Sequence, residues 1–160
     1  MKNKPKKPVT KRELAGRKEP HLSGTAVLDP RLAAAIARGK VLVKKMAAME
    51  GGAISSAETG RLLGIAEAEV LRRWRSHRLV GWKEGKAAHF PVWQFKNGEL
   101  LPGIEEVLQT FHSDDQWRVM GYFLGKRLSL HEQCPLGLLR SGETARVVAH
   151  AKAYAIENTW

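Results

Sequence analysis

Arginine side chains gather in one short stretch of this 160-residue chain, EAEVLRRWRSHR at positions 67–78. The candidate contact residues in it are Arg72, Arg73, Arg75, Ser76 and Arg78. A guanidinium can hold a phosphate or donate two parallel hydrogen bonds to a guanine edge. The stretch therefore indicates binding to nucleic acid. The alternative interpretation is a solvated helix face with no partner.

Two carboxylates complicate this interpretation. Glu67 and Glu69 lie near the start of the expected helix, where a helix that reads DNA usually meets base edges. A carboxylate there repels phosphates unless it accepts a hydrogen bond from cytosine. The acids weaken the prediction of operator reading, and they leave open that the segment serves as a dimerisation platform.

His131 and Cys134 could be a base with its nucleophile, or half of a metal site. The sequence offers no second ligand pair and no orienting acid for them, so the ordinary structural interpretation is favoured. The chain also lacks a glycine-rich phosphate loop, an HExxH motif, paired cysteines and a GxSxG motif. We therefore expect no enzymatic activity, no metal and no cofactor.

The positive charge is concentrated in the first half of the chain. Residues 1–86 contain 20 Lys and Arg against 8 Asp and Glu, whereas residues 87–160 contain 7 against 8. A basic half favours a polyanion, because neutralised phosphates release counterions. A single cysteine excludes an intrachain disulfide, and no apolar run approaches the roughly 20 residues that a bilayer demands. We expect a cytoplasmic protein that does not enter membranes.

Three regions are expected, beginning with a flexible basic arm over residues 1–28. Asp29 and Pro30 then predict a helix start, and Gly51 and Gly52 predict its end near Met49. Its apolar stripe comprises Leu32, Ala35, Gly39, Leu42, Met46 and Met49. That stripe should pack on the following domain or, alternatively, on a second copy in a homodimer.

Residues 29–92 are predicted to form a helix-turn-helix domain. Ser55 or Ser56 can cap a short helix that ends at Gly64, and a second helix should run from Glu67 to His77. It should bury Val70, Leu71 and Trp74. Strands at 80–82 and 87–90, joined through Gly85, would form a short wing-like hairpin. Pro91 should confine the second strand to an edge position.

Residues 93–160 are expected to form a compact all-helical domain, which makes the fold class mainly α. Candidate helices run over 103–111, 115–124, 135–139 and 143 to about 157. Ile104, Val107, Leu108 and Phe111 form the apolar face of the first of these helices. This neutral half should serve a partner other than DNA.

Two stretches, WQFKNGELLPGIEEVL from Trp93 and CPLGLLRSGETARVVAHAKAY from Cys134, resemble the toxin-binding domain of the Xre/MbcA/ParS-like antitoxin family. The resemblance covers about residues 54–156. The matching residues are Trp93, Gln94, Phe95, Gly98, Leu101, Pro102, Gly103, Phe123, Leu124, Pro135, Leu136, Leu139, Gly142, Val147 and Ala151. Most of them have the residue types of core or turn positions, so they identify a family rather than a contact surface.

The resemblance implies an antitoxin of a type II toxin-antitoxin system, whose DNA-binding domain represses its own operon. The implied partner is a RES-domain toxin that consumes NAD or transfers ADP-ribose, and the antitoxin would occlude its active-site cleft with its C-terminal region. The candidate toxin contacts are Lys152, Tyr154, Glu157, Asn158 and Trp160. The alternatives are a C-terminal segment that folds back on its own domain and, for the whole chain, a stand-alone transcription regulator.

Overall fold

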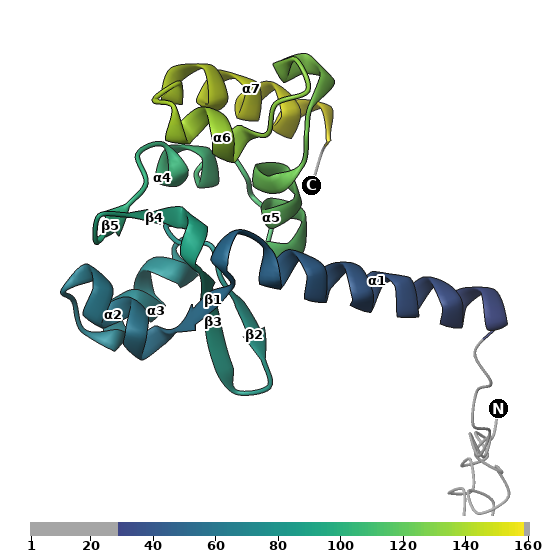
Figure 1. Cartoon of the computed structure of the whole chain (residues 1–160), viewed down its shortest axis with the longest axis horizontal. Helices are drawn as coiled ribbons and strands as arrows, with labels where there is room; N and C mark the ends of the chain where they lie inside the picture. Colours follow the sequence, from purple (N-terminus) through teal and green to yellow (C-terminus); the bar gives the residue numbers. More distant parts are fainter. Residues whose placement is uncertain (1–28, 159–160) are drawn as a thin grey trace, which may run out of the picture. The chain divides into compact units, whose positions relative to one another are not determined.

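The computed structural model describes residues 29–158. The chain divides into two compact units, Met1–Ala37 and Arg38–Trp160. The described part of the first unit is the beginning of helix α1 (Pro30–Ala48), and the packing below concerns the second unit. The predicted arm at 1–28 lies outside the described residues. The fold is mainly helical with a small antiparallel sheet (Figure 1).

Helix α1 begins and ends where the sequence predicts. The Arg31 amide donates to the Asp29 carboxylate at 2.8 Å, and Gly52, at φ 74°, follows the short 3-10 turn η2 (Met49–Gly51). Met46 packs against the core of the second unit, but Leu42 is 56% exposed. The expectation that the stripe packs on the following domain is thus right at Met46 and wrong at Leu42.

Two short helices, α2 (Ser56–Leu63) and α3 (Glu67–Arg75), follow strand β1 (Ala53–Ser55). Ser55 caps α2 with a capping box, in which its side chain accepts from the Glu58 amide while the Glu58 carboxylate accepts from the Ser55 amide. Gly64 ends α2 in the left-handed region at φ 67°. Gly60 is buried, and a Cβ there would lie 2.8 Å from the carbonyl oxygen of Ile65. A glycine therefore allows α2 to approach the turn closely.

A three-stranded antiparallel sheet joins β1 to strands β2 (Trp82–Glu84) and β3 (Ala87–Pro91), in the order β1-β3-β2. The predicted turn at Gly85 is confirmed, with φ 62°. The predicted edge position of the second strand is wrong, because β3 is central and Pro91 pairs with Ala53. Proline is tolerated because it is the last residue of the strand, where its missing N–H interrupts no ladder.

Strand β2 begins two residues later than expected because the polar backbone atoms of Val80 are bound elsewhere. The Gln94 side chain accepts from the Val80 amide and donates to its carbonyl, both at 2.8 Å. Gln94 also donates to the Pro91 carbonyl at 3.1 Å and has no exposed surface. This one side chain, in the 3-10 turn η3 (Val92–Gln94), replaces a strand partner for Val80.

The expectation that everything after residue 93 is helical is wrong at a second hairpin, β4 (Phe95–Lys96) and β5 (Glu99–Leu100). Asn97 and Gly98 form its turn with φ 54° and 76°. An Asn-Gly pair with both φ values positive is the preferred two-residue hairpin turn. The all-helical prediction for residues 93–160 therefore misses the strands on either side of this pair.

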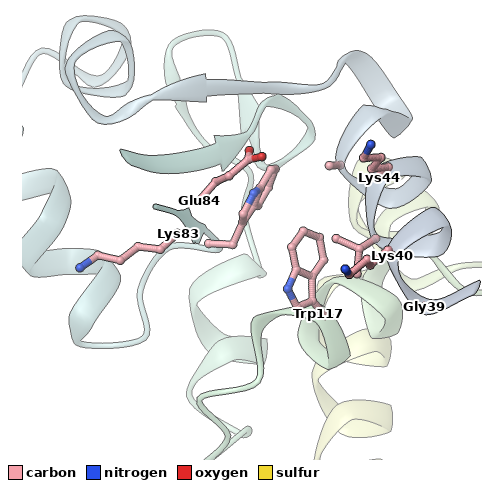
Figure 2. A pocket seen from close by; sticks show the side chains of 9 residues that line it. Gly39, Lys40, Lys44, Lys83, Glu84 and Trp117 are labelled. Atoms are coloured by element: carbon pink, nitrogen blue, oxygen red, sulfur yellow. The ribbon is translucent and has the colours of Figure 1, made fainter. Parts of the chain in front are cut away.

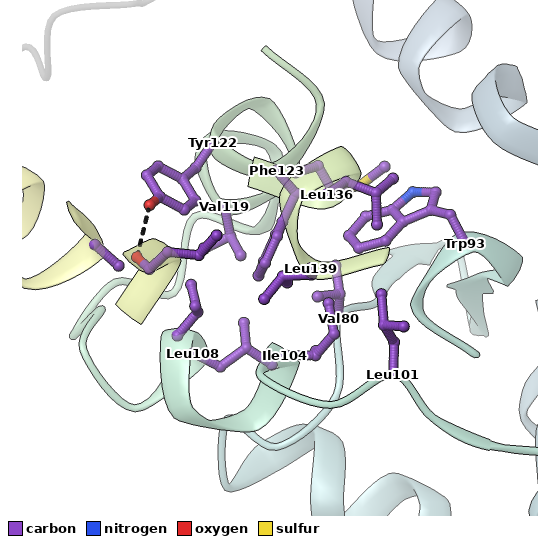
Figure 3. Packing of buried hydrophobic residues seen from close by; sticks show 14 of the residues in the cluster. Val80, Trp93, Leu101, Ile104, Leu108, Val119, Tyr122, Phe123, Leu136 and Leu139 are labelled. Carbon is purple, nitrogen blue, oxygen red and sulfur yellow. Dashed lines mark hydrogen bonds between the residues drawn. The ribbon is translucent and has the colours of Figure 1, made fainter. Parts of the chain in front are cut away.

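The remaining elements form the larger core. They are α4 (Ile104–Leu108), α5 (Gln116–Leu124), the 3-10 turn η4 (Leu128–Leu130), α6 (Pro135–Arg140) and α7 (Thr144–Glu157). All four predicted helices are present, although α4 is shorter than expected. Figure 3 shows Val119 and Phe123 of α5 close to Leu136 and Leu139, among the residues of one buried cluster. In residues 29–158, no helix has the length and apolar character needed to cross a membrane.

Candidate nucleic-acid interface

Helix α3 has one apolar and one basic face. Val70 is fully buried, and Leu71 and Trp74 pack against the same small cluster as Phe90, whose ring centroid lies 5.8 Å from that of Trp74. Positions 69, 72, 73 and 76 recur at helical spacing on the other side. Arg72, Arg75 and Ser76 are exposed. The predicted division of this helix into two faces is confirmed.

Glu69 binds two of the arginines on that face. Arg72 donates from Nε and from a terminal nitrogen to the two carboxylate oxygens, each at 2.6 Å, and Arg73 Nε donates at 3.0 Å. The hydrogen bonds from Arg72 and then from Arg73 lower the pKa of Glu69 to about 2. Glu69 therefore stays ionised at neutral pH, and a phosphate must compete with it for both guanidinium groups.

Glu67 has a different role, because its carboxylate accepts a hydrogen bond from the Ser56 hydroxyl. The bond links the start of α3 to the start of α2. The sequence placed both acids at the base-reading end of the helix, but it could not distinguish them. The structure assigns Glu67 to the helix pair itself and Glu69 to the arginine face.

The other three predicted contact residues lie at the end of α3 and just beyond it. Ser76 Oγ donates to the Arg73 carbonyl at 3.1 Å, and Arg78 Nε lies 3.3 Å from a Glu105 carboxylate oxygen of α4. Arg75 is exposed and forms no ion pair with any residue in the range 29–158. Arg75 is therefore the arginine of this group best placed to receive an anion without losing an existing partner.

The tip of the β2–β3 hairpin adds two lysines that are not among the predicted contact residues. Lys83 and Lys86 are exposed on either side of the Gly85 turn. Glu84 between them lies 3.8 Å from His89 Nε2. The sequence does contain a signal for these two lysines. They lie on either side of a glycine turn that follows a basic helix, and this arrangement favours a second phosphate contact.

The residues predicted to contact a toxin differ in how exposed they are. Lys152, Glu157 and Asn158 are exposed on and just after α7, and Trp160 lies outside the described residues. Tyr154 is only partly exposed, and its ring centroid lies 5.1 Å from that of the buried Tyr122. Tyr154, Glu157 and Asn158 share a cavity of about 490 Å³, which Lys152 does not line.

Arg127 and His150 also line this cavity, although no motif in the sequence indicates a site at either residue. The Arg127 guanidinium carbon lies 4.8 Å from the centroid of the Tyr154 ring. His150 is hydrogen-bonded to the Tyr122 hydroxyl through Nδ1 at 2.9 Å and to Ser129 Oγ through Nε2 at 2.7 Å. Burial, followed by the positive charge of Arg127, lowers the pKa of His150, so the imidazole is neutral at pH 7.

Two large apolar side chains after residue 93 are strongly exposed. Leu128 is 85% exposed and lines the cavity, and Ile156 on α7 is 78% exposed. Scattered single exposed leucines are normal, but one that lines a cavity, as Leu128 does, is typical of a surface that a partner covers.

Cys134 and His131 have structural roles at the ends of two short helical elements. Cys134 Sγ accepts a hydrogen bond from the Gly137 amide at 3.4 Å and so caps α6, and His131 ends η4 at φ 54°. In the part of the chain that the structure describes, no three His, Cys, Asp or Glu side chains are grouped as a metal site requires.

Comparison with known proteins gives one similar fold. No family model matches the chain, and no curated protein matches it. The NMR structure of Rv2175c is similar with a TM-score of 0.57 and 19% sequence identity, over 67% of this chain and 83% of that chain. At this identity the similarity shows a shared fold and nothing more.

Proposed function

We propose that this chain binds duplex DNA through α3 and the β2–β3 hairpin. The observation that carries the proposal is the exposed basic face of α3, whose opposite face packs on its own core. In this proposal, α2 and α3 with the turn at Gly64 act as a helix-turn-helix, and the hairpin that follows acts as a wing. Lys83 and Lys86 at its tip suit a neighbouring phosphate backbone.

Glu69 limits the affinity for DNA in this proposal. Replacing Glu69→Gln frees Arg72 and Arg73 for phosphates, so we expect several-fold tighter binding to a duplex taken from upstream of the gene. The slope of log K against log salt should become steeper by about 1 to 2. Fluorescence anisotropy of a labelled duplex at several salt concentrations measures both quantities.

Glu106→Gln is the matched control, because it removes one negative charge from an exposed site on α4. We expect it to leave the salt slope unchanged. An equal gain in both variants would mean that only net charge matters, and it would contradict a specific role for Glu69.

A second proposal concerns the C-terminal helices. We propose that they bind a protein partner and that the chain is an antitoxin of a type II system, with a RES-domain toxin as the partner and autorepression as the role of DNA binding. The resemblance over residues 54–156 supports this, and so do the exposed Leu128 in the cavity and the exposed Ile156 on α7. A homodimer within such a complex also stays a prediction.

Co-expression of the tagged chain with the product of the adjacent gene tests this second proposal. We expect capture of that product and rescue of growth. The double variant Leu128→Ser/Ile156→Ser should lose both, because it removes apolar area from the surface that the partner would cover. Leu62→Ser is a control at another exposed leucine, on α2. No capture and no rescue by the unaltered chain would favour the stand-alone regulator.

A further inference from the structure

A cavity of about 450 Å³ lies between helix α1, strand β2 and helix α5, entirely within the unit Arg38–Trp160. Its volume lies in the range of small-ligand sites, which are mostly apolar with a few polar groups. The residues that line it are Gly39, Lys40, Val43, Lys44, Ala47, Trp82, Lys83, Glu84 and Trp117.

Two tryptophans form the aromatic wall of this cavity. The ring centroids of Trp82 and Trp117 lie 5.2 Å apart, with their planes at 43°. Gly39 has nothing within 4 Å of the position where a Cβ would be, so the α1 side of the cavity is open at this residue. A flat ring that enters there can pack against indole surfaces, which favour aromatic partners.

The charged groups at the cavity are not evenly distributed. Figure 2 shows Lys40 and Lys44 together on α1, whereas the Lys83 side chain extends away from α1. Helix α1 contains no acidic residue to neutralise Lys40 and Lys44. Glu84 lies on the strand side of the cavity and has His89 as a neighbour at 3.8 Å. The α1 side therefore favours a negatively charged group.

We propose that this cavity binds a small planar aromatic carboxylate, with its ring against Trp82 and Trp117 and its carboxylate held by Lys40 and Lys44. A second copy of α1 fits this site less well, because it would bring its own basic residues, among them Arg38, to the same lysines. Trp82 is the first residue of β2, so the ligand contacts the hairpin that the DNA-binding proposal uses. The site goes beyond that proposal and is tested without DNA.

The test is isothermal titration of the full chain with 1-naphthoate. We expect saturable binding of one molecule per chain, and at least tenfold weaker binding of the neutral 1-naphthalenemethanol. The double variant Lys40→Ala/Lys44→Ala should lose at least tenfold in affinity. Lys45→Ala is the matched control, because this lysine is on the same helix, does not line the cavity and should leave the affinity unchanged.

A variant that fills the cavity provides an independent test of the binding site. Val43→Trp should abolish binding of 1-naphthoate while the thermal unfolding curve shows a folded protein. The proposal would be overturned by no binding of 1-naphthoate or by equal affinity for the acid and the alcohol. It would also be overturned by tighter binding of 1-naphthylmethylamine, or by unchanged affinity for 1-naphthoate in the double lysine variant. Conversion of a dimer to a monomer by Val43→Trp in sedimentation would also overturn it, because the cavity would then belong to an interface between copies.

Discussion

Replacing Arg72→Ala and Arg75→Ala together lowers the affinity for duplex DNA by about 30-fold or more. The expectation follows from the loss of the Arg75 contact, at about 1–3 kcal/mol, and from the charge of Glu69, which repels the phosphate backbone once Arg72 no longer neutralises it. Both side chains are exposed, Arg72 on the basic face of α3 and Arg75 at the end of the helix, so their removal leaves the apolar packing of the helix intact. Fluorescence anisotropy at one fixed salt concentration measures the loss.

Lys96→Ala with Lys152→Ala is the charge-matched control for this prediction. Both lysines are exposed, and they lie on β4 and α7, away from α3 in the sequence. We expect this pair to change the affinity by less than about threefold. An equal loss in the two double variants would show that the duplex responds to overall charge alone, and the assignment of α3 would then be wrong.

Replacing Gln94→Leu lowers the free energy of unfolding by about 2–5 kcal/mol. The Gln94 side chain is fully buried and satisfies the Val80 amide, the Val80 carbonyl and the Pro91 carbonyl. Leucine has nearly the same volume and none of these bonds, so polar backbone atoms remain buried without partners. Urea unfolding, followed by circular dichroism, measures the change.

Gln109→Leu controls for the loss of a glutamine. Its side chain also donates to backbone carbonyls, at 3.0 Å to His77 and 3.4 Å to Ser76, but it is exposed, so water replaces the lost bonds. We expect a change below about 1 kcal/mol. A Gln94→Leu variant within 1 kcal/mol of the unaltered chain would contradict the role that we assign to this side chain.

Local signals predicted much of the helical framework. Residues that cap or begin a helix do so through their own side chains. Asp29, Ser55 and Pro135 therefore mark helix starts in the sequence as they do in the structure. The spacing of Val70, Leu71 and Trp74 likewise predicted which face of α3 is buried. These features depend on neighbours within one or two helical turns, which the sequence itself displays.

The errors arise where distant residues decide the outcome. Strand β1 has only three residues, and it forms because β3 lies beside it. Pro91 is tolerated in the central strand because it is the last residue of that strand. Gln94 matches the family resemblance, but its bonds to Val80 span 14 positions. Glu69 was recognised as an obstacle to DNA, yet its simultaneous hold on Arg72 and Arg73 depends on side-chain geometry.

Titration of the isotope-labelled full chain with duplex DNA from upstream of its gene, followed by amide NMR shifts, tests the central claim most directly. The account predicts shifts concentrated in Glu67–Arg75 and around Gly85, with the amides of α7 unchanged. Shifts confined to α7, or no shifts at low salt, would contradict the assignment of α3 and the hairpin as the DNA-binding surface.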